Sequence, residues 1–176
     1  ASADLNVVLL EKNSSLGSKL LITGGGRCNI TNEKPIKKLL NSFHDKNFLK
    51  HSFYTFTNEM LLDLFRNRGL DFIVEDNNRV FPETEKSQDI LAILKYYLKD
   101  ITIKYNYEVS DIKKEDNFII NNDIIAEKII IATGGATFPK TGSTGDGYYL
   151  TDNPVTDIKY GLVPLITKKD LSDIAG

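Results

Sequence analysis

Residues 21–32 read Leu-Ile-Thr-Gly-Gly-Gly-Arg-Cys-Asn-Ile-Thr-Asn, a glycine triplet followed at once by a positive charge, a thiol and an amide. Three consecutive glycines remove every side chain from a stretch of backbone, so their N–H groups can face a ligand at close range. Arg27 adds a permanent charge and a planar set of donors. A flexible surface linker is the alternative, but such linkers rarely place Arg-Cys-Asn before an apolar Ile30. The pattern favours a loop that a ligand approaches closely.

Two short apolar runs lie near the two ends of the chain. Asn6–Glu11 ends in an acid, and Lys128–Ala132 leads directly into Thr133-Gly134-Gly135 and a loop rich in Gly, Ser and Thr at residues 139–148. Such runs are typical of strands buried on both faces of a parallel sheet, and small residues after a strand let the backbone pass near a ligand. An ordinary strand-to-helix turn is the alternative for the second run.

Helical spacing of apolar residues predicts two amphipathic helices. One covers Asn58–Arg68 behind a Thr57-Asn58 cap and stops at Gly69, and the other covers Ser87–Lys99 with Ser87 as its cap. Residues 43–56 are predicted only as an irregular or partly helical connection. Short β-prone runs predict a hairpin and then a strand followed by a meander, at residues 71–75, 79–81, 101–107, 109–113, 118–120 and 124–125.

Charge and cysteine content restrict the function classes. The 176 residues carry 22 Lys+Arg against 24 Asp+Glu along the chain, so we expect neither a nucleic-acid nor a membrane partner, and a small-molecule substrate instead. The single cysteine, Cys28, excludes an intrachain disulfide framework and favours the reducing cytoplasm. His44 and His51 lack the spacing of a metal site, so no metal is expected. The sequence does not indicate the oligomeric state.

The motifs together resemble the BaiN-like family of bacterial NAD(P)/FAD-dependent oxidoreductases. The resemblance extends over nearly the whole chain, and the Gly-Gly-Gly-Arg-Cys-Asn motif at residues 24–29 is its most specific part. Other matching segments are Phe53–Phe56, Arg79–Pro82, Lys86-Ser87, Ala132–Gly135 and Gly142–Tyr148. The fold class that the resemblance implies is α/β: a partial Rossmann-like FAD-binding domain with a parallel sheet, helices and a small β-meander.

The resemblance also implies a set of cofactor-binding residues. Glu11 would hold the adenosine ribose, and Lys12 and Lys19 would lie along the FAD phosphates or the flavin. The segment of Gly24, Gly25, Gly26, Arg27, Cys28 and Asn29 would pass by the isoalloxazine ring. Val109 would meet the adenine through its backbone, while Thr133, Gly134 and Gly135 would line the dinucleotide. No catalytic residue is assigned, because the flavin supplies the chemistry and NAD(P)H is the expected electron donor.

The departures from the family are equally definite. The family opens with a strand and a Gly-x-Gly-x-x-Gly turn that binds the pyrophosphate, and nothing before Ala1 supplies them. We therefore expect residues 1–165 to be a partial FAD/NAD(P)-binding domain lacking its first βα unit, with 166–176 as a connector toward a second domain. A truncated, non-catalytic nucleotide-binding or interaction module is the alternative. A phosphate-binding P-loop is rejected because Gly24–Arg27 lacks the Gly-Lys-Ser/Thr ending.

Several side chains retain two interpretations. Cys28 beside Arg27 can be a redox thiol, but it lacks a partner cysteine and is more simply a small packed residue. The aromatic residues Phe53, Tyr54 and Phe56 can form a wall over a substrate, although such clusters more often belong to a core. Asp146 is expected either to cap the following helix or to end a turn. The substrate is not indicated, although family members have been linked to reduction of carbon–carbon double bonds and to amine oxidation.

Overall fold

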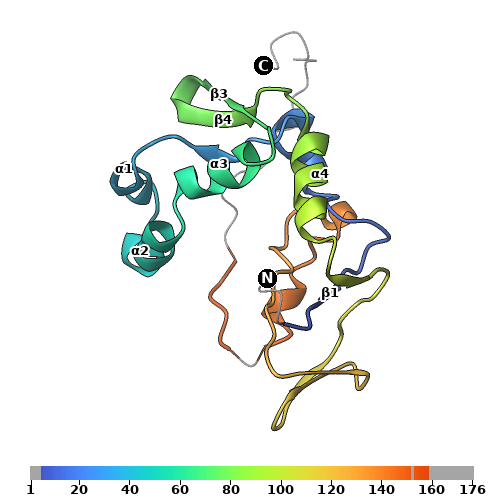
Figure 1. The fold of residues 1–176 in the computed structure, drawn as a ribbon. Coiled ribbons are helices and arrows are strands. Elements are labelled where there is room, and N and C mark those ends of the chain that lie inside the picture. Colours follow the sequence, from blue (N-terminus) through green and yellow to red (C-terminus); the bar gives the residue numbers. More distant parts are fainter. Residues whose placement is uncertain (1–4, 152, 159–176) are drawn as a thin grey trace, which may run out of the picture.

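The structure is a computed structural model that describes residues 5–151 and 153–158. Its parallel sheet consists of β1 (Val8–Leu10) and β5 (Thr102–Lys104), in a register that pairs Val8 with Thr102. Parallel strands need a long crossover, and here the connection contains the four α-helices found among the described residues, with α4 (Ser87–Tyr97) leading into β5 (Figure 1). The predicted α/β class with a parallel sheet and helices is confirmed.

A second sheet lies inside that crossover. It is antiparallel, in the order β2 (Thr31–Asn32), β4 (Arg79–Pro82), β3 (Phe72–Glu75). The predicted hairpin is confirmed, since Phe72 pairs with Pro82 and Glu75 with Arg79 across a 3-10 turn at Asp76–Asn78. Through β2, this sheet receives the chain directly from the glycine-rich loop.

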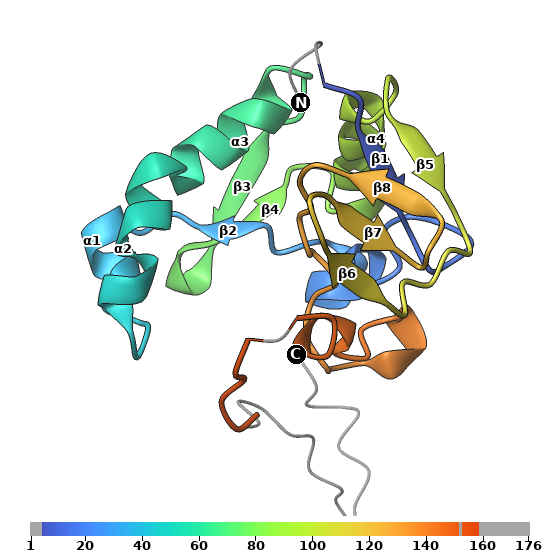
Figure 2. The same cartoon turned by 90° about the horizontal axis from the view of Figure 1, so that it is seen from below.

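The meander is also confirmed. Its strands are β6 (Ile112–Lys114), β7 (Phe118–Ile120) and β8 (Ile124–Ala126), paired antiparallel in chain order. The Asn121 side-chain oxygen accepts from the backbone amides of Ser110 and Asp111, which ties the β7–β8 turn to the start of β6. Figure 2 shows this meander on one side of the molecule and α1 and α2 on the other.

The remaining helices are α1 (Ile36–Leu40), α2 (Lys46–Thr55) and α3 (Asn58–Arg66). The predicted cap of α3 is confirmed, because the Thr57 hydroxyl accepts from the Met60 amide at 3.2 Å. Gly69, at φ +78°, then turns the chain out of the helical direction. The partly helical connection predicted over 43–56 is largely the regular helix α2.

The core joins the glycine-rich loop to α3 and α4. Cys28, Phe65, Leu70 and Ile90 are buried against one another, and Phe72 meets Phe65 edge-on with ring centroids 6.1 Å apart. Burying a large apolar side chain contributes about 1.5–3 kcal/mol. The glycine-rich loop is therefore anchored to this packed cluster through Cys28.

Ser87 is not the cap of α4, which corrects the prediction. The residue at the cap position is Lys86, and the Ser87 hydroxyl donates instead to the carbonyl of Leu21 at 3.1 Å. The side chain is fully buried, so this bond satisfies its polar atom. Ser87 thus fastens α4 to the 3-10 segment Leu20–Gly26 rather than to its own first turn.

The two runs predicted as strands buried on both faces differ from that prediction. Within the described residues β1 has β5 as its only strand neighbour, and Val8 is 39% exposed. Residues 128–132 form no strand, and Ile130 is 93% exposed. An extended apolar run becomes a strand only when a neighbour takes its backbone hydrogen bonds, and none of the described segments does so here.

The last part of the described chain is irregular. It contains 3-10 turns at Pro139–Thr141 and Asp146–Tyr148, and the connector predicted for residues 166–176 lies outside the described residues. Among the described helices, none has both the length and the apolar character needed to cross a membrane.

Candidate functional site

The site is built around the carboxyl end of β1. The Glu11 amide donates to the Lys104 carbonyl at 2.9 Å, and the Glu11 carbonyl accepts from the Tyr107 amide at 3.0 Å. The pairing continues to Asn13, whose carbonyl accepts from Asn106. Residues 11–13 therefore follow the segment that leaves β5. In open α/β sheets ligands bind at the carboxyl ends of the strands, so the expected place for a ligand is here.

Glu11 is held in position by its own turn. One carboxylate oxygen, Oε1, accepts from the Asn13 backbone amide at 2.8 Å, and the side chain is half-buried. An amide bond to a carboxylate favours its charged form and restricts its rotation. The structure thus places an oriented carboxylate at the end of β1.

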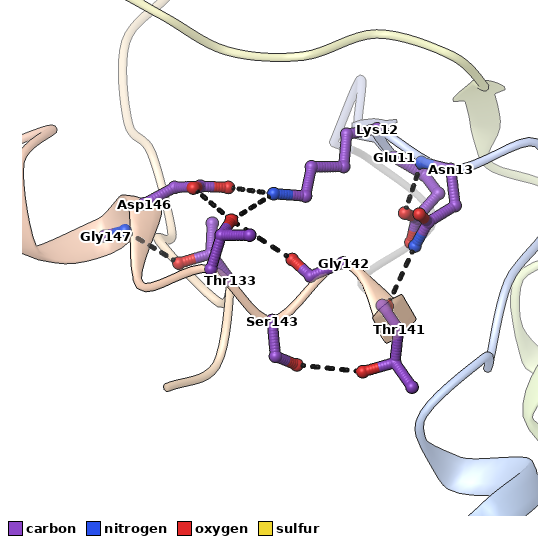
Figure 3. A network of polar contacts seen from close by, with 10 residues as sticks. Glu11, Lys12, Asn13, Thr133, Thr141, Gly142, Ser143, Asp146 and Gly147 are labelled. Carbon is purple, nitrogen blue, oxygen red and sulfur yellow. Dashed lines mark hydrogen bonds and ion pairs between the residues drawn. The ribbon is translucent and has the colours of Figure 1, made fainter. Parts of the chain in front are cut away.

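Lys12 connects this end of β1 to the loop at residues 133–148. Its ammonium lies 2.5 Å from Asp146 Oδ2 and also donates to the Thr144 hydroxyl (Figure 3). The Lys12 bond is the largest of the causes that lower the pKa of Asp146. Of the two interpretations of Asp146, the helix cap is wrong: its carboxylate engages Lys12 and Thr144, and the 3-10 turn that begins at Asp146 has no side-chain cap.

Asn13 makes a second connection to the same loop. Its amide nitrogen donates to the Thr141 carbonyl at 3.3 Å, and Gly142 packs directly against it. A Cβ on Gly142 would lie 2.7 Å from that nitrogen, and the residue has φ +88°. The backbone conformation therefore favours glycine at this position, and a Cβ would also force the Asn13 amide to move.

Thr133 organises the turn that closes the loop. Its hydroxyl accepts from the Gly147 amide at 3.0 Å, as Figure 3 shows. Thr133 and Gly134 are exposed and Gly135 is half-buried, with Gly134 at φ +75°. This leaves backbone accessible beside the Lys12–Asp146 pair.

Lys19, just before the 3-10 segment Leu20–Gly26, contacts the same loop. Its ammonium donates to the Thr137 carbonyl at 2.8 Å and to the Thr137 hydroxyl at 3.0 Å. The two lysines singled out by sequence, Lys12 and Lys19, therefore both contact the loop that follows residues 133–135. The end of β1 and the start of the glycine-rich segment, which are close in sequence, both contact the distant segment at residues 133–148.

The glycine triplet has left-handed backbone throughout, with φ +56°, +68° and +90° at Gly24, Gly25 and Gly26. A Cβ on Gly24 would lie 2.8 Å from the Asn29 amide nitrogen and 3.0 Å from the Phe81 ring, whereas one on Gly25 would have no atom within 4 Å. Gly24 is therefore required by packing, while Gly25 presents bare backbone to open space. Asn29 is exposed beside them.

Arg27 is fixed by an ion-pair network. Its guanidinium lies 2.6 Å from Glu75 and 2.8 Å from Glu85, and its Cζ stands 4.2 Å from the centre of the Phe81 ring. The bond to Glu75 is the main cause that raises the pKa of Arg27, and the same bond lowers the pKa of Glu75. The charge of Arg27 therefore attaches the loop to the β3–β4 hairpin.

Cys28 is 3% exposed and packs in the core cluster. Burial raises the pKa of its thiol, which disfavours the thiolate form needed for nucleophilic or redox chemistry. Its φ is +63°, so the side chain turns inward from the left-handed segment. This placement is that of a small packed residue.

The matches to known proteins agree with this geometry. The family model described as the HI0933-like protein Rossmann domain matches residues 1–160. The chain belongs to the HI0933-like family. This confirms the resemblance to BaiN-like proteins and the Rossmann-like fold class.

The curated relatives carry two different names. The chain is 28% identical to a 3-dehydro-bile acid delta(4,6)-reductase of Clostridium scindens, which it matches over 96% of its own length and 43% of the relative's. It is 28% identical to a ribosomal RNA dihydrouridine synthase of Escherichia coli (96% and 44%) and 26% identical to that of Haemophilus influenzae (97% and 46%). The chain thus spans less than half the length of the relatives it matches.

Not every residue singled out for the HI0933-like site is brought together. Glu11, Lys12, Lys19 and Thr133–Gly135 share one region, whereas Arg27 and Cys28 face the hairpin and the core. Val109 is half-buried and comes two residues after Tyr107, the residue that pairs with Glu11. The described residues contain no group of three or more His, Cys, Asp or Glu that could hold a metal ion.

Sequence reasoning missed several residues of this HI0933-like site. Asn13, Thr137 and Thr144 hold the loop to the end of β1 and to Lys19, and Glu75 and Glu85 hold Arg27. None of them carries a signal in the sequence, since all five are ordinary polar residues without a distinctive spacing.

Proposed function

We propose that the full-length protein is an FAD-dependent oxidoreductase that uses NAD(P)H to reduce a carbon–carbon double bond of an organic substrate. Membership of the HI0933-like family supports an oxidoreductase of the flavoprotein type. The two kinds of relative share one chemistry in their names. A delta(4,6)-reductase saturates carbon–carbon double bonds, and dihydrouridine is uridine with two hydrogens added to such a bond.

The observation that carries this proposal is the meeting of Glu11, Lys12 and Lys19 with the loop that follows Thr133–Gly135. An oriented carboxylate suits the ribose hydroxyls, and two ammonium groups beside exposed glycine backbone suit a pyrophosphate. Gly25, with open space above it, suits the approach of a flat ring. These residues fit FAD in charge, donor type and backbone access.

The roles of the individual residues follow from that fit. Glu11 would accept from the ribose, and Lys12 and Lys19 would neutralise the phosphates. Thr133–Gly135 would line the dinucleotide, Gly24–Asn29 would pass by the ring system, and the Val109 backbone would meet the adenine. Lys12 and Lys19 already have partners in Asp146 and Thr137, so binding would share or exchange these contacts.

Bound FAD would supply hydride transfer, and the chain would position it. In the net reaction, NAD(P)H and one proton add two hydrogens across the double bond and leave NAD(P)⁺. We assign Cys28 no role in this reaction, because its thiol is buried and burial raises its pKa, which disfavours the thiolate. We also propose that the protein works in the cytoplasm, since the one cysteine of these 176 residues leaves them without an intrachain disulfide.

An anaerobic titration tests the function. NADH or NADPH is added to the purified full-length protein loaded with FAD, and the flavin absorption band is followed. Bleaching by either nucleotide, and its recovery on addition of an electron-poor alkene, supports the proposal. Failure of both nucleotides to bleach the bound flavin would refute the NAD(P)H linkage, and failure to take up FAD would favour the non-catalytic nucleotide-binding module.

A further inference from the structure

The turn between β7 and β8, residues 121–123, contacts the chain that runs from β5 to β6. At one end of this chain the Tyr107 hydroxyl donates to Asp123 Oδ2 at 2.9 Å. Tyr107 is also the residue whose amide pairs with the Glu11 carbonyl at the end of β1. The turn therefore supports a segment that begins beside Glu11, the residue proposed to hold the ribose.

The side chain of Asn121 makes four hydrogen bonds to this segment. Its Nδ2 donates to the Glu108 carbonyl at 2.8 Å, and its Oδ1 accepts from the amides of Ser110 and Asp111 at 2.9 and 3.1 Å. The Ser110 hydroxyl donates to the same oxygen at 3.2 Å. The donor and the acceptor of one carboxamide are thus both used on the residues that flank Val109. Such a set of bonds fixes a backbone conformation and not a single contact.

Val109 lies between these fixed residues with its own backbone groups unpaired. Neither its amide nor its carbonyl has a hydrogen-bond partner among residues 5–151 and 153–158, and the residue is half-buried. Backbone amides and carbonyls are strong hydrogen-bonding groups, so this pair can take a ligand of matching pattern. An adenine ring offers that pattern, because its N1 accepts a hydrogen bond and its 6-amino group donates one.

We propose that Asn121 is a positioning residue of the cofactor site, which holds the Val109 backbone in the conformation that recognises adenine. The inference rests on the proposed function, since it deepens the assignment of Val109 to the adenine of FAD. Asn121 acts through Glu108, Ser110 and Asp111 and not by touching the cofactor. The meander thereby contributes to the choice of cofactor, although no residue of its strands is assigned to the site.

The same turn contains a matched control. Asn122 has the same side chain and nearly the same backbone, with φ +52° against +50° for Asn121. Within the described part of the chain its side chain makes one hydrogen bond, accepted from the Lys113 ammonium at 2.7 Å. Glycine adopts this left-handed conformation without strain. Asn121→Gly and Asn122→Gly therefore each remove one carboxamide and leave the turn able to form.

The test compares the dissociation constants of the full-length protein for FAD and for the FAD analogue that carries hypoxanthine in place of adenine. Hypoxanthine has a carbonyl at position 6 and a hydrogen on N1, so it reverses the donor and the acceptor that Val109 would meet. We expect the parent to bind FAD about tenfold more tightly than the analogue, because the reversed groups are left unpaired. Asn121→Gly should reduce this preference to about twofold or less, whereas Asn122→Gly should keep it.

Amide hydrogen exchange of the flavin-free protein gives a second readout. Asn121→Gly should speed the exchange of the Ser110 and Asp111 amides, which lose their acceptor, and Asn122→Gly should leave it unchanged. A general loss of stability would weaken the binding of both flavins alike. The ratio of the two dissociation constants therefore reports the positioning of the backbone and not the stability of the fold.

Each outcome decides the proposal. Loss of the preference for FAD in Asn121→Gly alone, together with faster exchange of the Ser110 and Asp111 amides, supports it. The proposal is overturned if the parent binds both flavins equally, if both variants change the preference alike, or if exchange is unchanged in Asn121→Gly. A parent that takes up neither flavin overturns the proposed function and this inference together. Uptake of FAD with a preference that does not depend on Asn121 overturns this inference alone.

Discussion

Lys12 Nζ lies 2.5 Å from Asp146 Oδ2, although 134 positions separate the two residues in the sequence. The contact fastens the loop at residues 133–148 to the carboxyl end of β1. The exposed backbone of Thr133 and Gly134 is thereby held beside Glu11 and Lys12. This ion pair is one of several contacts that hold the parts of the proposed cofactor site together.

Acid should weaken this attachment. The pKa of Asp146 is lowered in the folded protein, so its contribution to stability is complete above the ordinary aspartate value and is lost as the pH falls through the lowered value. We expect Asp146→Asn to reduce stability at neutral pH by less than about 1 kcal/mol. The difference from the parent should shrink below about pH 4, where Asp carboxylates protonate. Thermal midpoints recorded against pH measure it, and a difference that grows in acid would contradict this prediction.

Two glycines of the triplet should respond differently to substitution. Gly24→Ala places Cβ 2.8 Å from the Asn29 nitrogen, so we expect a clear loss of stability beyond the left-handed penalty of about 1–2 kcal/mol. Gly25→Ala meets no atom within 4 Å and should incur that penalty alone, yet it should weaken FAD binding because its methyl occupies the ring's approach. Denaturant unfolding and FAD titration separate the two effects. Equal stability of the two variants would show that a Cβ at Gly24 is tolerated as well as one at Gly25, against this prediction.

A lysine at position 27 should not hold the glycine-rich loop as the arginine does. Its planar fork reaches both Glu75 and Glu85 while resting on Phe81, and a lysine cannot reproduce that geometry. We expect Arg27→Lys to speed amide hydrogen exchange over residues 23–29. Arg66→Lys is the matched control, because Arg66 pairs with Glu59 and Asp63 on the surface of α3. Unchanged exchange in the Arg27 variant would mean that the network does not hold the loop.

Phe65 should be costly to truncate. It is 1% exposed and packs with Cys28, Leu70 and Ile90, so Phe65→Ala is expected to lower the free energy of unfolding by about 3–5 kcal/mol. Phe48, which is 80% exposed, is the control, and Phe48→Ala should change stability by less than about 0.5 kcal/mol. Urea unfolding of both variants gives the comparison, and similar losses would contradict the assigned core.

The sequence predicted those elements whose signals are local. Thr57 and Gly69 bound α3, and the Asp76–Asn78 turn defines the hairpin, because caps and turns are encoded by neighbouring residues. Residues 128–132 were predicted as a strand and are not one, since strand formation depends on a distant partner. The hydroxyl of Ser87 was misassigned for the same reason, because its acceptor, Leu21, lies 66 positions away.

The candidate site was predicted in part. Glu11 at a strand end and the lysines near the Gly-rich segments were found from the motifs that resemble the BaiN-like family, and the structure brings them together. The polar partners Asn13, Thr137 and Thr144 were not found, because a single hydrogen-bonding residue in a polar loop has no periodicity or spacing. The sequence also did not predict that the Arg27 side chain turns toward the β3–β4 hairpin, since its partner Glu75 is 48 positions away.

A visible absorption spectrum of the purified full-length protein tests the central claim most directly. We expect flavin bands at one FAD per chain, and loss of most of that flavin in a Glu11→Ala, Lys12→Ala variant that retains its far-ultraviolet circular dichroism. A colourless protein that takes up no FAD when incubated with it would contradict the claim that the carboxyl end of β1 and the loop at residues 133–148 form a flavin site.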